Sequence, residues 1–447
     1  MSQSIANRSL DSLSGPDASE AAAEYVRDYL GFMTRCAQAF GEIVPLRFEG
    51  ELFCLLTNPE HINEVLKDRL LFVKAQDLRV LKGLVGNGLL TSEGDFWQRQ
   101  RRLSQSVFHQ QRIRDYANVM VRYTQQMLEG WHEGDILDVH HQMMRLTLDI
   151  VMKTLFGQDT TDGDASRVAH ALDAAMNWYE AREDTRLWAR LISISRDRQY
   201  KTAIAALDKT LYAMIAQRRK DGLTSDDLLT MLMQIEDADD GSRMSDRQLR
   251  DEAATLILAG HETTANALSW TWMLLANHPQ VSQRLTEELQ TVLKGRSPTF
   301  SDLPQLTYTD AVIKEAMRLY PPLTDISREA TQDCEIGGYF IPKGTTLIAS
   351  QWVMHRDSRY FEQPEQFIPE RWLDGLEKRL PKGVYFPFGG GPRICIGNSF
   401  AQMEGVLILA TISQAFNLEL LPSQEIALQP SITLRPKHGI QVVLKKA

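Results

Sequence analysis

Apolar residues along most of this chain recur every three or four positions, which is the spacing of one face of an α-helix. One such run extends from Met144 to Leu155, and Gly157 directly after it is a typical helix end. Strand-like alternation is confined to three short stretches, at residues 44–57, 334–350 and 431–446. Hairpin turns are expected at Gly50 and Gly439. The pattern therefore predicts a mainly α-helical protein with small β-sheets.

The longest predicted helix begins at a capping box formed by Ser245 and Gln248 and ends before Pro279. It is long for a globular protein, so we expect it to cross the molecule. Its middle, Ala259–Thr264, reads AGHETT and is polar where a buried helix should be apolar. Thr263 lies on the same stripe as the apolar residues and can bond to the carbonyl four residues before it. This composition indicates either room for a ligand or a packing notch of glycine and threonine.

No internal repeat or linker divides the chain, so we predict one domain over residues 25–447 after a polar segment at residues 1–24. With 43% hydrophobic residues, the 447-residue chain can bury a large core. The polar segment lacks the apolar core of a signal peptide, and no apolar run reaches the length of a membrane span. We expect a monomeric cytoplasmic protein without a membrane anchor.

Charge and cysteine content narrow the possible partners. The formal net charge of -9 argues against nucleic acid, because neutralising phosphates requires a basic surface. Scarce cysteines are typical of a reducing compartment, and the spacing of these fits neither a disulfide framework nor a zinc site. They are Cys36, Cys54, Cys334 and Cys395. The acidic run Glu236–Gly241 lacks the spacing of an EF-hand and is interpreted as a solvated loop.

The stretch from Phe388 to Ala401 reads FGGGPRICIGNSFA and combines glycines, an arginine and a cysteine. It matches neither a phosphate-binding loop nor a dinucleotide fingerprint. Cys395 comes just before a helical pattern, where free backbone N–H groups favour an anion, so we expect its pKa to be lowered. Glycines such as Gly389 and Gly397 would let the backbone approach a flat cofactor and adopt positive φ. A buried core cysteine is the alternative.

Phe388, Gly391, Arg393, Cys395 and Gly397 match the pattern F-x-x-G-x-R-x-C-x-G. Through this pattern the chain resembles the cytochrome P450 haem-thiolate monooxygenases, and the absence of an anchor makes it similar to the soluble bacterial members. The resemblance implies haem b as the cofactor, held between the long central helix and the helix that follows the cysteine loop. It also implies Cys395 as the proximal ligand of the haem iron.

The resemblance assigns further residues to the cofactor. Arg393 is expected to pair with a carboxylate on the haem rim. Trp97 and Arg101 match the W-x-x-x-R pattern that reaches a haem propionate in relatives. Arg328 and His355 are weaker candidates for the same task, and for His355 a structural role is an equal alternative. The residues placed around haem in this way are Trp97, Arg101, Ala259, Arg328, His355, Phe388, Gly389, Arg393, Cys395 and Gly397.

Two further motifs match the family and imply a role in the fold. Glu315 and Arg318 lie three residues apart on one helical face, as in the family's E-x-x-R element. Arg371 belongs to a sequence that matches the P-E-R element. The resemblance implies that the three side chains form a buried charged triad, which would stabilise the protein rather than take part in catalysis.

The resemblance implies a reaction in which one oxygen atom of O2 enters a C–H bond of a hydrophobic substrate such as a fatty acid or terpenoid. Glu262 and Thr263 match the family's acid–alcohol pair, which delivers protons during oxygen activation. The pair argues against two alternatives, namely a peroxygenase that uses hydrogen peroxide directly and a haem-binding protein without enzymatic activity.

The resemblance implies that four regions bind the substrate, at residues 72–90, 172–194, 256–259 and 323–326, and these are largely apolar, which suits a lipid-like molecule. The second region contains Trp178, Tyr179 and Trp188. Asp325 is unusual, because the corresponding turn is small or apolar in relatives. Its carboxyl group either forms a hydrogen bond with a polar group of the substrate or caps the turn.

Electrons are expected from a separate redox partner. The chain contains neither a flavin- or nicotinamide-binding glycine motif nor clustered cysteines for an iron–sulfur centre. We therefore expect a ferredoxin or flavodoxin together with its reductase. Basic residues in two segments would attract such an acidic partner, unless they are ordinary solvated helix charges. These residues are Arg99, Arg101, Arg102, Arg112, Arg114, Lys378, Arg379 and Lys382.

Overall fold

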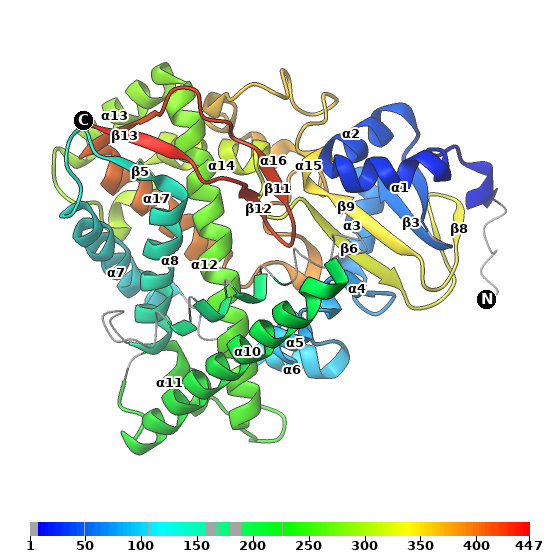
Figure 1. Ribbon diagram of the computed structural model, residues 1–447, viewed down its shortest axis with the longest axis horizontal. Helices are drawn as coiled ribbons and strands as arrows, with labels where there is room; N and C mark the ends of the chain where they lie inside the picture. The colour runs from blue at the N-terminus through cyan, green and yellow to red at the C-terminus, as the bar shows by residue number, and fades with distance from the viewer. Residues whose placement is uncertain are drawn as a thin grey trace.

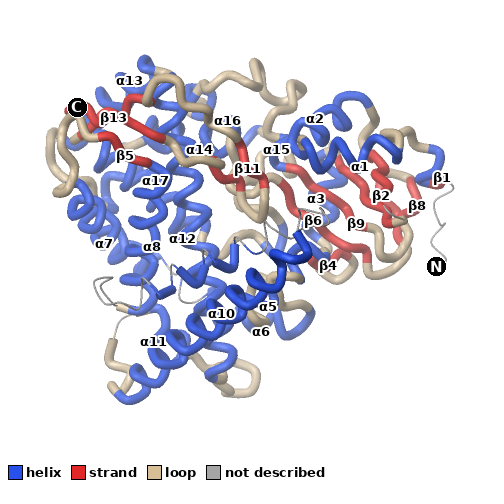
Figure 2. The backbone as a smooth tube through the Cα atoms, in the orientation of Figure 1, coloured by secondary structure: helices blue, strands red, loops and turns tan. Residues whose placement is uncertain are grey.

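The computed structural model describes residues 8–48, 50–105, 108, 110–157, 167–168, 170–172, 174–176, 178, 189–225 and 227–447. Helices make up most of the molecule, while the strands collect in small sheets, the largest of which lies beside α1 and α2 (Figure 2). The predicted class, mainly α with small β-sheets, is confirmed.

The helices vary from single turns to long rods (Figure 1). They are α1 (Ala18–Arg27), α2 (Tyr29–Ala39), α3 (Pro59–Lys67), α4 (Gln76–Arg79), α5 (Lys82–Val85), α6 (Gly94–Gln105), α7 (Gln110–Leu128), α8 (Val139–Phe156), α10 (Ala189–Lys220), α11 (Leu228–Gln234), α12 (Asp246–Asn277), α13 (Pro279–Leu293), α14 (Thr307–Leu319), α15 (Gln351–Met354), α16 (Leu376–Arg379) and α17 (Asn398–Ser413). Short 3-10 helices are η1 (Leu10–Ser12), η3 (Phe300–Gln305), η4 (Pro369–Trp372) and η5 (Gly391–Arg393).

Helix α12 runs through the middle of the molecule, as its length predicted (Figure 1). The capping box is present: the Gln248 amide donates to the Ser245 hydroxyl, and the Gln248 side chain accepts from the Ser245 amide. The helix packs against α8, α10, α14 and α17, so apolar residues are buried all round it. Helix α8 ends as predicted at Gly157, which has a φ of 64°.

The strands form four sheets, ordered β2-β3-β9-β6-β4, β1-β8-β7, β10-β13-β5 and β11-β12. They are β1 (Arg8–Ser9), β2 (Ile43–Phe48), β3 (Glu51–Leu56), β4 (Phe72–Lys74), β5 (Ile136–Asp138), β6 (Asp325–Ala330), β7 (Cys334–Ile336), β8 (Tyr339–Ile341), β9 (Thr346–Ser350), β10 (Phe416–Leu420), β11 (Leu428–Pro430), β12 (Leu434–Pro436) and β13 (Gln441–Lys446). Strand β1 pairs with β8, which attaches part of the polar N-terminal segment to the fold.

The two predicted hairpin turns have different outcomes. Strands β2 and β3 pair antiparallel around Gly50, whose φ is 88°, as expected. The turn at Gly439, with a φ of 70°, instead joins β12 and β13, which belong to different sheets. A Cβ on Gly439 would lie 2.0 Å from the Asp138 carboxylate, so this turn packs closely against the end of β5. The predicted C-terminal hairpin is therefore wrong, because β13 pairs with β5 and β10 instead.

Among the helices of the described residues, none has a stretch both long enough and apolar enough to cross a lipid bilayer.

Candidate active site

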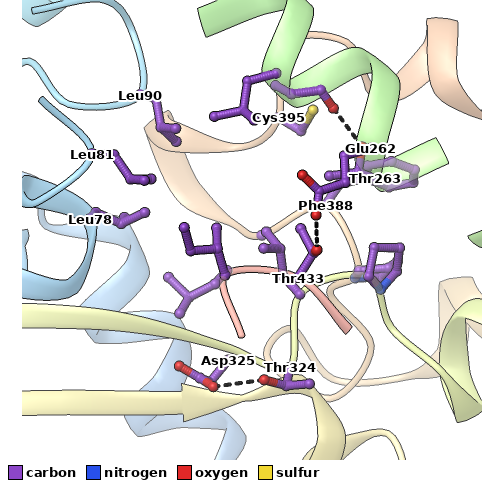
Figure 3. A pocket seen from close by; sticks show the side chains of 18 of the residues that line it. Leu78, Leu81, Leu90, Glu262, Thr263, Thr324, Asp325, Phe388, Cys395 and Thr433 are labelled. Carbon is purple, nitrogen blue, oxygen red and sulfur yellow. Dashed lines mark hydrogen bonds between the residues drawn. The ribbon is translucent and has the colours of Figure 1, made fainter. Parts of the chain in front are cut away.

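A cavity of about 1390 Å³ lies between α12, the cysteine loop, β6 and the β11–β12 hairpin (Figure 3). Apolar side chains such as Leu78, Leu81 and Leu90 form one wall, and Cys395 lies on another side. Its position between the central helix and the cysteine loop is where the sequence predicted the cofactor.

The cysteine loop turns back on itself before α17. The backbone amide of Cys395 donates to the carbonyl of Phe388 at 2.9 Å, which fixes the loop from both ends. The Cys395 side chain is exposed to the cavity, so the alternative of a core cysteine packed among apolar residues is excluded. In this geometry burial raises the pKa of the Cys395 thiol, and the Gly397 amide and Arg101 only oppose that rise. The expected lowering of the pKa is therefore wrong for the chain by itself.

The loop glycines serve two different purposes. Gly391 has a φ of 63°, and a Cβ there would lie 2.1 Å from the carbonyl oxygen of Leu66 in α3. This glycine therefore allows the loop to touch α3, rather than a cofactor. Gly389 also has positive φ, at 75°, and a Cβ there would crowd Ile326 at 3.2 Å. At Gly397 a Cβ would come no closer than 4.0 Å to the nearest side chain, so space remains there.

Basic side chains surround the indole of Trp97 at one edge of the cavity. The Arg393 guanidinium lies 5.3 Å from the centre of the Trp97 ring, and the Lys74 ammonium 5.9 Å. Arg393 also pairs with Glu93, with 3.0 Å between Nη1 and Oε1. Arg101 instead donates to the carbonyl of Ile394 at 2.8 Å, which ties α6 to the cysteine loop.

Two buried cations on neighbouring strands complete this edge. Arg328 on β6 is 6% exposed, and burial lowers its pKa to about 10. Lys74 on β4 donates to the carbonyls of Leu89 and Ser92, both at 2.8 Å, and burial lowers its pKa to about 7. No motif pointed to Lys74. The signal that could have found it is a charged residue at the end of the apolar run LLFVK.

This edge fits the carboxylates of a haem. Arg393 Nε is buried and has no hydrogen-bond partner. The Lys74 ammonium has three donors, of which two are used by carbonyl groups. Buried donors without acceptors cost free energy, so an anionic ligand at this edge would stabilise the protein. Arg393, Lys74 and Arg328 would hold such a group, with Trp97 beneath Arg393 and Lys74, and Cys395 would supply sulfur to the iron.

His355 does not belong to this edge. It is fully buried, does not line the cavity, and its Nε2 accepts from the backbone amide of Phe386 at 3.0 Å. Burial lowers its pKa, so the ring is neutral. Its carbonyl accepts from Arg318, which connects His355 to the buried triad. The structure therefore places His355 in the packing below the site, as the structural alternative expected.

The polar middle of α12 opens onto the cavity. Between Leu249 and Leu275, only Ala259, Gly260 and Thr263 are not buried. The Thr263 hydroxyl donates to the carbonyl of Ala259 at 2.6 Å, as the sequence suggested. A Cβ on Gly260 would lie 3.2 Å from a methyl group of α8, so this glycine also allows close helix packing. Thr263 therefore borders space for a ligand, and Gly260 forms the packing notch against α8, so both expectations are met.

Glu262 lies at the cavity but is held by the last hairpin. The Arg435 Nε donates to its carboxylate at 2.7 Å, and the Thr433 hydroxyl donates to the same oxygen (Figure 3). Burial alone would raise the pKa of Glu262, but these partners hold it below the ordinary value. Glu262 is therefore an ionised carboxylate with a fixed cation. No sequence motif indicated that Arg435, far away in the chain, would be its partner.

A second buried acid, Glu404 in α17, was missed by the motifs. It is fully buried, and neither carboxyl oxygen has a hydrogen bond of ordinary geometry. Burial raises its pKa to about 8, which the nearby Thr264 side chain of α12 only partly opposes. Glu404 is therefore neutral at pH 7. An acidic residue inside the apolar run of α17 was the available signal.

Asp325 begins β6 and lines the cavity. Its Oδ2 accepts from the Tyr29 hydroxyl at 2.7 Å and from the Thr324 hydroxyl at 2.9 Å. Burial raises the pKa of the Asp325 carboxyl. The carboxyl group is therefore held by donors of the protein, including Thr324 in the turn, and it also borders the ligand space. Its position is compatible with both alternatives, a cap of the turn and a hydrogen bond to the substrate.

The predicted triad is confirmed. Glu315 and Arg318 are both fully buried, with 2.8 Å between Oε1 and Nη2, and Arg371 Nε lies 3.0 Å from the same oxygen. The Trp372 indole donates to the other oxygen of Glu315 at 2.8 Å. The triad joins α14 to η4 and does not line the cavity.

The predicted basic run on α6 is largely neutralised. Arg99 and Arg102 contact Asp237 at 2.8 and 2.7 Å, and Arg102 also reaches Asp239. The acidic stretch before α12 is therefore an ion-pair partner rather than a merely solvated loop, because Asp237 is buried. Arg114 is exposed, and its guanidinium lies over the ring of Phe300. The side chain of Arg112 lies outside the described residues.

The aromatic residues predicted for the substrate region are only partly placed. Trp178 stacks on Tyr200 at 4.2 Å and donates to Asp197, and it does not line the cavity. Tyr179 and Trp188 lie outside the described residues.

Comparison with known proteins gives one consistent family. The cytochrome P450 family model matches residues 24–444. Cyclooctatin synthase of Streptomyces melanosporofaciens is 35% identical over 400 residues, which cover 89% of this chain and 87% of that protein. Cyclooctat-9-en-7-ol 5-monooxygenase of the same organism is 34% identical over 385 residues, covering 86% of this chain and 84% of that protein.

A solved structure supports the same assignment. The crystal structure of the cytochrome P450DA heme domain aligns with a TM-score of 0.86 and 27% identity, covering 95% of this chain and 93% of that chain. Cys395 and the basic edge around Trp97 border the same cavity. The chain therefore belongs to the cytochrome P450 family of haem-dependent monooxygenases.

Proposed function

We propose that this enzyme inserts one oxygen atom of O2 into a C–H bond of a hydrophobic molecule such as a terpenoid or fatty acid. The observation that carries the proposal is the cavity itself, which has Cys395 on one side and apolar leucines on another. Apolar walls bind apolar substrates and exclude water from the reacting bond.

When bound, haem with a thiolate ligand supplies the chemistry of O–O bond cleavage. The protein contributes binding, orientation and proton handling. Arg393, Lys74 and Arg328 would hold the propionates, because Arg393 Nε has no hydrogen-bond partner, Lys74 has a third donor, and all three cations lie at the cavity. Thr255, Thr263 and Thr264 of α12 line the cavity, and of these only Thr263 is not buried, so we assign its hydroxyl the task of holding a proton donor there. Glu262 would keep the neighbouring hairpin in place through Arg435.

Electrons would come from a ferredoxin or flavodoxin and its reductase. Arg99 and Arg102 are engaged by acidic side chains, so they contribute little net positive charge to a docking surface. Lys378, Arg379 and Lys382 remain exposed in the segment before the cysteine loop. We propose that these three residues, rather than the α6 run, provide the positive charge for an acidic partner.

The experiment that tests the proposal is the absorption spectrum of the reduced, carbon-monoxide-bound protein. It should show the band that gives the family its name. Cys395→Ser should abolish this band, while Cys334→Ser, a partly buried cysteine outside the cavity, should leave it unchanged. A normal band in the Cys395→Ser protein would refute the ligand assignment.

Thr263→Ala separates the proposed reaction from the peroxide-driven alternative. Because Glu262 is held as an ion pair, Thr263 is the residue at the cavity whose loss should uncouple electron use from product formation. We expect less product per NAD(P)H oxidised, with product formation from hydrogen peroxide retained. Unchanged coupling in Thr263→Ala would remove Thr263 from proton delivery.

A further inference from the structure

One carboxyl group in the cavity wall has no cationic partner. Asp325 lies on β6, and Figure 3 shows Asp325 and Thr324 on the opposite side of the pocket from Cys395. Within the described part of the chain, no lysine, arginine or histidine forms an ion pair with Asp325. Arg328 belongs to the same strand and also lines the cavity, but its position has the opposite parity, so its side chain leaves the other face of the strand and forms no ion pair with Asp325.

Hydrogen bonds from the protein hold the Asp325 carboxyl group in place but do not fill all of its acceptor sites. Tyr29 and Thr324 both donate to Oδ2, at 2.7 and 2.9 Å, and the Ser327 side chain also interacts with the carboxyl group. A carboxyl group offers about four acceptor sites, so these three donors leave capacity for a further donor from the cavity. Tyr29 comes from α2, which means that the group is held from two separate elements.

The surroundings of Asp325 disfavour an anion. Asp77, on α4, lies close enough to raise the pKa of Asp325 further, in addition to the effect of burial. A fatty-acid carboxylate at this end of the cavity would therefore meet two acidic groups and no paired cation. The buried cations Lys74 and Arg393 lie instead at Trp97, where they fit the haem propionates. Arg27 and Lys437 also line the cavity, but neither forms an ion pair with Asp325 among the described residues. The wall at Asp325 and Asp77 therefore favours a neutral polar group over an anion.

We propose that Asp325, held by Tyr29 and Thr324, determines substrate specificity by binding the hydroxyl group of a neutral hydrophobic alcohol. The substrate class would be terpenoid-like alcohols, in preference to hydrocarbons of the same skeleton and to fatty acids. The hydroxyl would be anchored at β6, and the other end of the molecule would extend toward Cys395. This inference rests on the proposed function, because it takes the cavity as the substrate site.

The test is a spectral titration of the oxidised holoenzyme with farnesol, farnesene and farnesoic acid, which share an isoprenoid chain. For the wild type we expect farnesol to bind about 10-fold tighter than farnesene, the value of one hydrogen bond to a buried carboxyl group. Farnesoic acid should bind more weakly than farnesol.

Variants assign the preference to one side chain. In Asp325→Ala the 10-fold advantage of farnesol should disappear, while farnesene binding is retained. Asp325→Asn keeps donors and acceptors without charge, so it should retain part of the advantage and bind farnesoic acid better. Tyr29→Phe should reduce the advantage less than Asp325→Ala. The matched control is Glu329→Gln on the same strand, since Glu329 pairs with Arg79 and does not line the cavity.

Three results would overturn the inference: an unchanged ratio of farnesol to farnesene affinity in Asp325→Ala, an equal loss for all three compounds, or no spectral shift with any of them in the wild type. Thermal unfolding shows whether each variant folds, and Asp325→Asn carries the test if Asp325→Ala does not. The titration needs neither electrons nor O2, so failure of monooxygenase turnover is distinguishable from failure of this inference.

Discussion

Two groups of buried charges in this molecule differ in whether the protein satisfies them. At the triad, Arg318 bonds to Glu315 and to the carbonyls of His355, Pro364 and Gln366, and nothing is left over. At the basic edge around Trp97, a buried nitrogen of Arg393 has no partner. Both groups are largely hidden from the outer solvent, yet only the second borders a cavity.

The difference shows how to separate charges that stabilise a fold from charges that bind a ligand. Desolvating a charge is costly, and a protein offsets that cost fully only when every donor finds an acceptor. The Glu315 triad meets this condition without a ligand. The basic edge meets it only with an anion from outside the chain, which is what haem propionates provide.

The largest effect should follow from breaking the satisfied group. Glu315→Gln leaves Arg318 and Arg371 buried without a negative partner, so we expect the free energy of unfolding to fall by roughly 3 to 5 kcal/mol. Urea denaturation of the holoenzyme measures this change. The control is Arg284→Ala, which removes an exposed pair with Glu370 and should cost less than about 1 kcal/mol. Equal losses in both variants would contradict the comparison.

Glu404 extends the comparison to a buried acid without a cation. Its pKa is about 8 in the folded protein against an ordinary value of 4.5, so the folded state prefers the protonated form. This contribution to stability is complete below pH 4.5 and is lost as the pH rises through 8. In the wild type the free energy of unfolding should therefore fall by on the order of 2 to 4 kcal/mol as the pH rises through this range, and Glu404→Gln should abolish this fall.

Urea denaturation of the holoenzyme at a series of pH values measures this dependence on Glu404. Glu425→Gln, which changes an exposed carboxyl group, should follow the wild-type curve. A Glu404→Gln curve parallel to the wild type would show that Glu404 does not titrate in this range.

Breaking the unsatisfied group should affect the cofactor more than the fold. Arg393→Ala should weaken haem binding by about 10-fold or more, the value of one charge-assisted hydrogen bond. The free energy of unfolding of the chain without haem should change by only about 1 kcal/mol, because Glu93 is partly exposed. Haem titration of the apoprotein, with denaturation in parallel, measures both. The haem affinity of Arg393→Lys should lie between that of the wild type and that of Arg393→Ala. If Arg393→Ala lowered the free energy of unfolding more than the free energy of haem binding, our assignment would be reversed.

The smallest effect is expected at the surface. Asp237→Asn removes the ion-pair partner of Arg99 and one of the two partners of Arg102, so an acidic ferredoxin should reduce the enzyme about two- to five-fold faster at low salt. Stopped-flow reduction at increasing ionic strength measures this gain, which should vanish at high salt. A gain that persists at high salt would indicate a change other than steering by charge.

The sequence predicts correctly those features that depend on neighbours along the chain. The capping box, the bond from Thr263 to Ala259 and the pair of Glu315 and Arg318 each span three or four residues, a distance set by helix geometry. The glycine at the end of α8 follows from the same local rules.

Features that depend on packing between distant segments could not be predicted. Arg435 as the partner of Glu262 and Asp237 as the partner of Arg99 join residues more than a hundred positions apart. The requirement for glycine at position 391 comes from contact with α3, which no local pattern reveals. A lowered pKa of Cys395 was predicted from the helix end alone. Desolvation of the thiol by the surrounding segments is the larger effect, and it raises the pKa.

The hairpin that holds Glu262 also has a consequence for synthesis of the chain. Arg435 follows Glu262 by 173 residues, so the nascent polypeptide carries the carboxylate long before its cation leaves the ribosome. Until then α12 cannot bury Glu262 in its ionised form without a large cost. The side of the cavity at Glu262 is therefore completed only after Thr433 and Arg435 have been synthesised, and a chain that stops before them lacks the cation that holds the Glu262 carboxylate.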